Sequence, residues 1–177
     1  MVSSGEAMGS IDTFRTWRLV GTRLQPADFA DCCRMNHNEQ VRATLGGVLT
    51  DEQSKAWMDL NLAHWDKHGF GVYFLRDLQS GSFIGRAGLR HADVEGMLDE
   101  IEVLYALMPE HWGQGLATEA ACECLRIGFE QLRLQEIVGF TLPTNLGSRR
   151  VLEKSGLTYE RNIIHAGLPH VLYRIRK

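Results

Sequence analysis

Hydrophobic and polar residues fall into two kinds of pattern along the chain: alternating stretches, and stretches with an apolar residue at every third or fourth position. Alternation, or a run of β-branched and aromatic residues, predicts strands at residues 16–24, 70–76, 83–91, 100–108, 136–142, 157–165 and 168–176. Helical spacing predicts helices at residues 27–35, 50–68, 117–132 and 145–155. The helix between the strands at 100–108 and 136–142 predicts a parallel, right-handed crossover. The order of elements predicts an α/β (α+β) fold, with a mixed and mostly antiparallel sheet of six to seven strands and helices on both faces.

Local signals mark the ends of several of these elements. Thr50 with Gln53 three residues later is a capping box at the start of the second helix, and Gly69 stands where that helix should end. The segment 36–47, which is polar and then contains glycine, is predicted to be a connection that covers part of the rim of a site. The acidic segment 91–99 is predicted to be a second connection.

Two glycines, Gly113 and Gly115, lie between the strand that stops at Pro109 and the helix that follows. The first N–H groups of a helix have no partner within it, and the positive end of the helix dipole lies at the same place. Because glycine lets another molecule approach the backbone closely, this turn predicts an anion-binding site. It is not a P-loop, since no Gly-x-x-x-x-Gly-Lys-Ser/Thr run occurs. A dinucleotide fingerprint is disfavoured, because Thr118 stands where its third glycine belongs.

Composition excludes several classes of protein. The 177 residues carry a net charge of −3, which gives no basic footprint for nucleic acid. No apolar run approaches the roughly 20 residues of a membrane span, so no membrane partner is expected. No repeat or interdomain linker interrupts the chain, so residues 1–177 are predicted to form a single domain in which residues 1–12 are a loose N-terminal tail.

Cysteine and histidine spacing predicts no metal. The four cysteines lack Cys-x-x-Cys spacing, so neither a zinc site nor a disulfide framework is expected and a reducing, cytoplasmic location is predicted. His64 and His68 are four residues apart on a predicted helix, but the aromatic residues around them favour core packing over a metal site.

Two motifs resemble those of a known family. Residues 112–120, Trp-Gly-Gln-Gly-Leu-Ala-Thr-Glu-Ala, are similar to the acetyl-CoA-binding motif of the GNAT N-acetyltransferases. Asn145-x-x-Ser148, followed by Val-Leu-Glu-Lys-Ser-Gly-Leu at residues 151–157, is similar to the second block of that family. The resemblance extends from about residue 16 to the C-terminus. It is narrower to the branch that contains the bacterial ribosomal-protein N-terminal (Rim-like) acetyltransferases.

The resemblance implies a splayed central strand pair, with acetyl-CoA as co-substrate and no metal. Pantetheine would contact the backbone of Ala106, Leu107 and Met108 in the splay. Ser148 would lie at the sulfur end of the cofactor, and Asn145 would contact the pantetheine or that sulfur end, with capping of its own helix as the alternative. The pyrophosphate would bind the N–H groups of Gly113, Gln114, Gly115, Leu116, Ala117 and Thr118, and Trp112, the first residue of the motif, would also bind the cofactor.

The resemblance also implies catalytic roles. Glu102 is the candidate general base, although Glu100 and Glu102 lie two residues apart and are also consistent with the solvent face of a strand. Leu152 occupies the place where many family members carry a tyrosine as general acid. Ser148 is the remaining candidate for orienting or protonating the thiol, and back-bonding to a helical carbonyl is the alternative.

These observations predict an acetyl-CoA-dependent N-acetyltransferase that modifies a primary amine by direct attack on the thioester. The alternative is a non-catalytic CoA-binding module that acts as a sensor or partner. The acceptor is left open between a small amine and a protein N-terminus, a ribosomal protein among them. A homodimer is one of the open oligomeric states.

Overall fold

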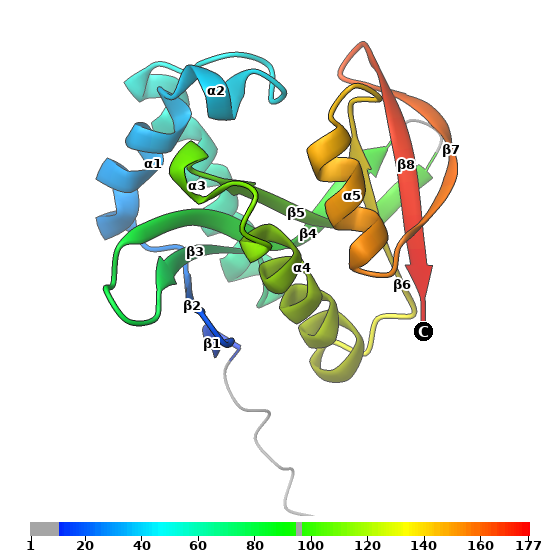
Figure 1. Cartoon of the computed structure of the whole chain (residues 1–177), viewed down its shortest axis with the longest axis horizontal. Coiled ribbons are helices and arrows are strands. Elements are labelled where there is room, and N and C mark those ends of the chain that lie inside the picture. The colour runs from blue at the N-terminus through cyan, green and yellow to red at the C-terminus, as the bar shows by residue number, and fades with distance from the viewer. Residues whose placement is uncertain (1–10, 95–96) are drawn as a thin grey trace, which may run out of the picture.

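The computed structural model describes residues 11–94 and 97–177, and its strands form an eight-stranded sheet (Figure 1). In chain order the strands are β1 (Thr13–Arg15), β2 (Leu19–Arg23), β3 (Val72–Asp77), β4 (Phe83–Val94), β5 (Met97–Leu107), β6 (Glu136–Thr141), β7 (Thr158–His165) and β8 (Leu168–Arg176). Their spatial order is β1-β2-β3-β4-β5-β6-β8-β7, and every neighbouring pair is antiparallel except β5 and β6. The predicted mixed, mostly antiparallel sheet is confirmed, with eight strands instead of six to seven.

The additional strand is β1, which precedes the strand predicted at residues 16–24, and a turn that starts at Thr16 separates it from β2, so the predicted strand begins three residues later than expected. The Thr16 N–H donates to the Leu19 carbonyl at 2.9 Å, and the Leu19 N–H donates back to Thr16 Oγ1 at 3.1 Å. This turn contains no glycine or proline, so the sequence carries no signal for it. Of the predicted loose tail, residues 1–10 lie outside the described residues. Ile11 is buried, and its carbonyl accepts a hydrogen bond from the Tyr73 hydroxyl, so a tail reaching residue 12 is too long.

Helices cover both faces of the sheet, as predicted. Trp57 packs over Arg86 of β4 on one face. On the other face α4 packs on β4 and β5, α5 contacts β6, and the two helices lie side by side (Figure 1). The α-helices are α1 (Phe29–Asn36), α2 (Glu39–Arg42), α3 (Asp51–His68), α4 (Leu116–Arg126) and α5 (Leu146–Lys154), with a π-helical turn at Ile127–Gln131 and 3-10 turns at Pro26–Asp28 and Pro109–His111.

The predicted ends of α3 are confirmed. The Gln53 N–H donates to Thr50 Oγ1 at 3.2 Å, and the Thr50 N–H donates to Gln53 Oε1 at 2.9 Å, which completes the capping box. Gly69 ends the helix in the left-handed region with a φ of 74°. Local sequence signals are therefore sufficient to place this helix.

Both segments predicted to be connections contain regular structure. The segment 36–47 includes α2, which Asn38 caps by accepting a hydrogen bond from the Val41 N–H. In the segment 91–99, β4 continues to Val94 and β5 begins at Met97. These strand ends persist because apolar residues of β4 pack in a second cluster with residues of β6, β7 and β8. The acidic residues in the same segment made it resemble a solvent-exposed connection, so the apolar face of the strand was not apparent from the sequence.

The parallel pair β5–β6 is splayed. The two strands are in register at a single position, Glu102 with Val138, whereas β6 and β8 pair over six successive positions from Glu136 to Thr141. Beyond Glu102, the edge of β5 that faces β6 therefore has no continuous ladder. Among the described helices, none combines the length and apolar character needed to cross a bilayer.

Candidate functional site

The glycine turn joins the end of β5 to α4. Gly113 and Gly115 have φ values of 71° and 78°, a region that side chains other than glycine rarely adopt. Gly115 is the N-cap of α4 and supplies no side-chain cap for the first N–H groups. A Cβ atom at Gly113 would meet nothing within 4 Å, and one at Gly115 would meet Arg18 Nη2 at 3.6 Å. The turn thus presents an uncapped helix N-terminus, which is the geometry of an anion-binding site.

Side chains within the turn fix it to β5. Trp112 Nε1 donates to the Leu107 carbonyl at 2.8 Å, and Gln114 Nε2 donates to the Glu110 carbonyl at 3.0 Å. The backbone before α4 is therefore ordered by contacts inside the motif itself. The assignment of residues 113–118 to pyrophosphate stays a prediction.

Arg18 is a cation beside this turn that sequence reasoning missed. Its Nη1 donates to the Gln114 carbonyl at 2.8 Å, and its Nε forms an ion pair with Glu119 of α4 at 2.7 Å. Burial alone would raise the pKa of Glu119, but hydrogen bonds from Thr16 and Arg18 outweigh it and lower the pKa. Because 101 residues separate Arg18 from Glu119, no local pattern could have identified the contact.

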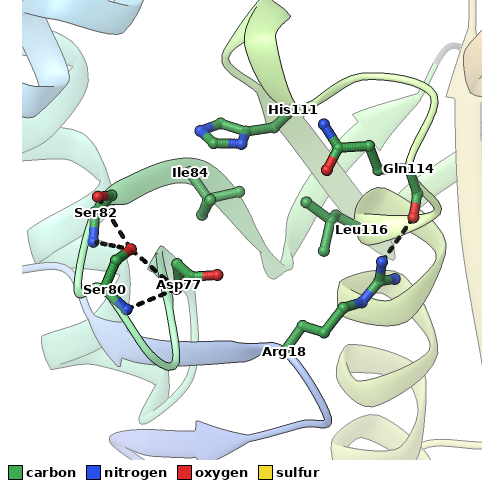
Figure 2. Close-up of a pocket in the computed structure, with 8 residues that line it drawn as sticks. All are labelled: Arg18, Asp77, Ser80, Ser82, Ile84, His111, Gln114 and Leu116. Atoms are coloured by element: carbon green, nitrogen blue, oxygen red, sulfur yellow. Dashed lines mark hydrogen bonds between the residues drawn. The ribbon is translucent and has the colours of Figure 1, made fainter.

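A cavity of about 320 Å³ lies between the glycine turn and the β3–β4 turn (Figure 2). Its walls carry both charge signs, since Arg18 lies on one side and Asp77 on the other. Asp77 accepts hydrogen bonds from the Ser80 N–H and hydroxyl at 2.7 and 2.9 Å, and these lower its pKa. The lining residues are Arg18, Asp77, Ser80, Ser82, Ile84, His111, Gln114 and Leu116.

The backbone of β5 has one edge on β4 and one edge on the splay. The Met108 N–H donates to the Ile84 carbonyl at 2.9 Å, and Arg86 lies opposite Ala106. In an antiparallel pair, main-chain groups alternate between the two edges. Ala106 and Met108 therefore face β4, while Tyr105 and Leu107 face β6. Of the three predicted pantetheine contacts, only Leu107 has its main-chain groups on the splayed edge, and its carbonyl already accepts from Trp112.

Glu102 is buried on the face of β5 that also carries Arg90 of β4. Arg90 Nε donates to Glu102 Oε1 at 2.6 Å, and Glu102 is 4% exposed. Glu102 Oε2 makes no hydrogen bond. A fully enclosed side-chain polar atom without a hydrogen-bond partner occurs once among the described residues, at Ser155 Oγ, so Glu102 Oε2 is not fully enclosed. Glu102 Oε2 therefore touches accessible space. Glu100 pairs with Arg174 at 2.9 Å, so the interpretation of both glutamates as a solvent face is wrong.

Tyr105 and Ser148 meet on the opposite face. The Tyr105 hydroxyl donates to the Ser148 carbonyl at 2.9 Å and lies 3.0 Å from Ser148 Oγ. Burial raises the pKa of Tyr105. Asn145 caps α5 by accepting from the Ser148 N–H at 3.1 Å, and its amide donates to Thr44 Oγ1 at 3.3 Å. Tyr105 is thus a phenol beside the predicted site that the sequence motifs did not single out.

Leu152, at the usual position of the tyrosine, is buried at 1% exposure. A Cβ added at Gly139 of β6 would lie 2.4 Å from Leu152 Cδ2, so the leucine packs directly on the strand. It fills the core and contributes no proton.

Among the described residues, two groups of side chains bring potential metal ligands within 4.8 Å of one another: His64, His68 and His91, and Cys33, His37 and Asp51. Both nitrogens of His64 are engaged, because Nδ1 lies 2.9 Å from the Phe70 carbonyl and Nε2 accepts from the His91 N–H at 3.1 Å. Two imidazoles of the first group, those of His68 and His91, therefore remain as possible metal ligands. In the second group, His37 pairs with Asp51 at 2.9 Å.

Comparison with known proteins identifies the family. The model of the acetyltransferase (GNAT) domain matches residues 18–158. YkkB from Bacillus subtilis, described as uncharacterised, is 28% identical over 137 residues, which cover 77% of this chain and 79% of YkkB. An acetyltransferase from Agrobacterium tumefaciens has a TM-score of 0.83 at 27% identity, covering 99% of this chain and 100% of its own. A protein described as a GnaT-family acetyltransferase from Bordetella pertussis has a TM-score of 0.81 at 28% identity, covering 92% and 98%.

More distant structural neighbours, at 13% to 18% identity, share the fold alone. They include ribosomal-protein acetyltransferases and a spermidine N-acetyltransferase from Vibrio cholerae, so the Rim-like branch is one of several similar groups. The predicted fold and the resemblance to N-acetyltransferases are confirmed. The chain belongs to the GNAT acetyltransferase family.

Proposed function

We propose that the chain transfers an acetyl group from acetyl-CoA to a primary amine by direct attack of the amine on the thioester. The observation that carries this proposal is the splay between β5 and β6, with a buried carboxylate on one face and a phenol on the other. Direct transfer requires a proton acceptor where the amine enters and a proton donor where the thiol leaves.

The co-substrate fits the site through backbone groups. Its pyrophosphate would lie on the N–H groups of residues 113–118, where two left-handed glycines leave the helix N-terminus uncapped. Its pantetheine would follow the splayed edge of β5, where Tyr105 and Leu107 present their main-chain groups. Asn145 and Ser148 lie beside Tyr105 and would contact the sulfur end.

Glu102 and Tyr105 would act at opposite ends of the reaction. Glu102 Oε2 takes a proton from the amine as the new N–C bond forms. The C–S bond breaks, and the leaving sulfur takes a proton from the Tyr105 hydroxyl, which Ser148 orients. Arg90 holds Glu102 Oε1 at 2.6 Å, which leaves Oε2 as the oxygen that accepts this proton. The raised pKa of Tyr105 keeps its proton in place until the thiolate needs it.

The alternative is a CoA-binding module without turnover. The sequence supports this alternative because Leu152 occupies the position where many family members carry a tyrosine. Tyr105 weakens that support, because a phenol from β5 lies against α5. The acceptor class spans small amines and protein N-termini, a ribosomal protein among them. A cytoplasmic location completes the proposal, and the oligomeric state is left open, with a homodimer as one candidate.

The test combines binding with turnover. Acetyl-CoA at about 100 times its Kd should stabilise the protein by about 2.7 kcal/mol. Acetylated product should form across a panel of primary amines and short peptides, followed by mass because Cys122 is exposed and reacts with thiol reagents. Absence of stabilisation would overturn the proposal. Stabilisation without product across the whole panel would establish the CoA-binding module instead.

A further inference from the structure

Arg86 of β4 carries a nearly enclosed guanidinium with no acidic partner in the part of the chain that the structure describes. It is 5% exposed, and its Nη1 donates to Asn36 Oδ1 at 3.2 Å. Its Cζ lies 4.1 Å from the centre of the Trp57 ring. Described carboxylates form ion pairs with Arg76 and Arg90, but none lies within 4.0 Å of Arg86. Burial lowers its pKa to about 9, so the group stays charged at neutral pH.

Two of its nitrogens are free to bind. Arg86 Nε and Nη2 make no hydrogen bond. Among the described residues, Ser155 Oγ is the one side-chain polar atom that is both fully enclosed and without a hydrogen-bond partner, so neither of these two arginine nitrogens is fully enclosed. Both N–H groups therefore face accessible space. Nε and Nη2 form one side of the planar guanidinium, and that side binds a carboxylate through two parallel hydrogen bonds.

This open side of Arg86 shares a sheet face with the proposed base. Arg86 lies opposite Ala106 and Arg90 lies opposite Glu102, so all four side chains emerge on one face of β4 and β5. The two arginines are four positions apart along β4, which corresponds to about 13 Å between their Cα atoms. The intervening pair on this face is Gly88 of β4 and Leu104 of β5, and the backbone of Gly71 and Val72 packs directly over Gly88, so a ligand that reaches both ends would pass over Leu104.

The local charge balance favours an anion. Arg90 is matched by Glu102, whereas Arg86 has no carboxylate among its described contacts. Arg42, which is buried and donates to the carbonyls of Gly47 and Leu45, is a second cation whose charge acts on Arg86. A buried cation costs free energy unless an anion accompanies it. Binding of a polyamine beside Arg86 would increase that free-energy cost, whereas binding of a carboxylate would remove part of it.

We propose that the acceptor is an amino-carboxylate, whose carboxylate binds Nε and Nη2 of Arg86 while its amine lies at Glu102. The inference depends on the proposed acetyl transfer and specifies its substrate class. Free amino acids, and short peptides with a carboxylate near the amine, belong to this class.

The test compares matched acceptors on the wild-type protein. Each amino acid is assayed beside its primary amide and beside the amine that lacks the carboxyl group, with spermidine as the polycation. The amide has the more easily deprotonated amine, so a preference for the acid cannot arise from amine ionisation. We expect kcat/KM to be about 10- to 100-fold higher for the acid, the value of a charged hydrogen-bonded pair.

Variants then assign the preference to Arg86. Arg86→Gln should abolish the preference for the acid by raising its KM, and Arg86→Lys should restore part of it, with the Kd for acetyl-CoA unchanged in both. Arg15→Gln, the same change at an exposed residue of β1, should alter neither. Should Arg86→Gln fail to fold, competitive inhibition of the wild-type protein by deamino-carboxylates supports the site, and its absence overturns it.

The outcomes separate the two proposals. Acetylation of amides or spermidine at rates equal to the acids overturns the carboxylate site and leaves acetyl transfer standing. Preference for acids that survives in Arg86→Gln overturns the role of Arg86. No product with any amine overturns the proposed function, and this inference with it.

Discussion

Replacement of Tyr105 by phenylalanine isolates the proposed proton donor. The change removes one hydroxyl, which contacts the Ser148 carbonyl at 2.9 Å and lies 3.0 Å from Ser148 Oγ. Loss of that hydrogen bond should lower the free energy of unfolding by about 1 kcal/mol. A general acid contributes about 10²- to 10⁴-fold to the rate, which corresponds to about 3 to 5 kcal/mol of transition-state stabilisation. The fall in kcat should therefore greatly exceed what the small loss of stability explains.

The assay measures kcat and KM for acetyl-CoA together with the melting temperature. We expect kcat to fall at least about 100-fold, with KM for acetyl-CoA nearly unchanged because the main-chain contacts of β5 remain. Tyr159→Phe is the matched control, since Tyr159 is exposed and its hydroxyl donates to Asn162 at 3.1 Å. A Tyr105→Phe enzyme with kcat within about twofold of wild type would refute the assignment, because that is far below the contribution of a general acid.

Three further changes test other parts of the structure. Glu102→Gln should lower kcat/KM by about 10- to 1000-fold and remove the acidic limb of its pH profile; an unaltered profile would exclude Glu102 as the base. Gly115→Val should abolish acetyl-CoA binding, since a β-branched residue is strained at a φ of 78° and would distort the turn whose N–H groups bind the pyrophosphate. Asparagine tolerates this φ, so the Gly115→Asn variant should fold normally and still bind acetyl-CoA weakly. Normal binding of acetyl-CoA by both variants would show that the pyrophosphate does not bind at this turn. Burial lowers the pKa of His64 from 6.5 to about 4, so the stability that its neutral form contributes is present above pH 6.5 and is lost as the pH falls from 6.5 toward 4. The melting temperature should fall less over this window in His64→Gln, and an equal fall would attribute the acid sensitivity to another group.

Local signals in the sequence were sufficient for the elements whose ends have their own chemistry. Thr50 and Gln53 specify the start of α3, and Gly113 and Gly115 specify the turn before α4, because capping and left-handed φ values depend on few residues. The parallel crossover from β5 to β6 followed from topology alone.

Contacts between distant segments could not be predicted in the same way. Arg18 reaches Glu119 across 101 residues, and the Tyr105 hydroxyl reaches Ser148 across 43. Which edge of β5 each main-chain group occupies depends on pairing with β4, so the assignment of Ala106 and Met108 to pantetheine required the register. The unpaired charge of Arg86 likewise emerges only when the neighbouring helices and strands are packed around it.

The alternation of β5 restricts which insertions and deletions this enzyme could survive. Glu102 and Tyr105 are separated by an odd number of positions, so they emerge on opposite sides of the sheet. Removal or addition of one residue between them would bring both side chains to the same side of the sheet. Either the amine would then lack its proposed proton acceptor or the thiol would lack its proposed proton donor. Gains and losses in chain length should therefore be confined to places such as the β3–β4 turn, while the spacing between the two groups stays fixed in every functional descendant.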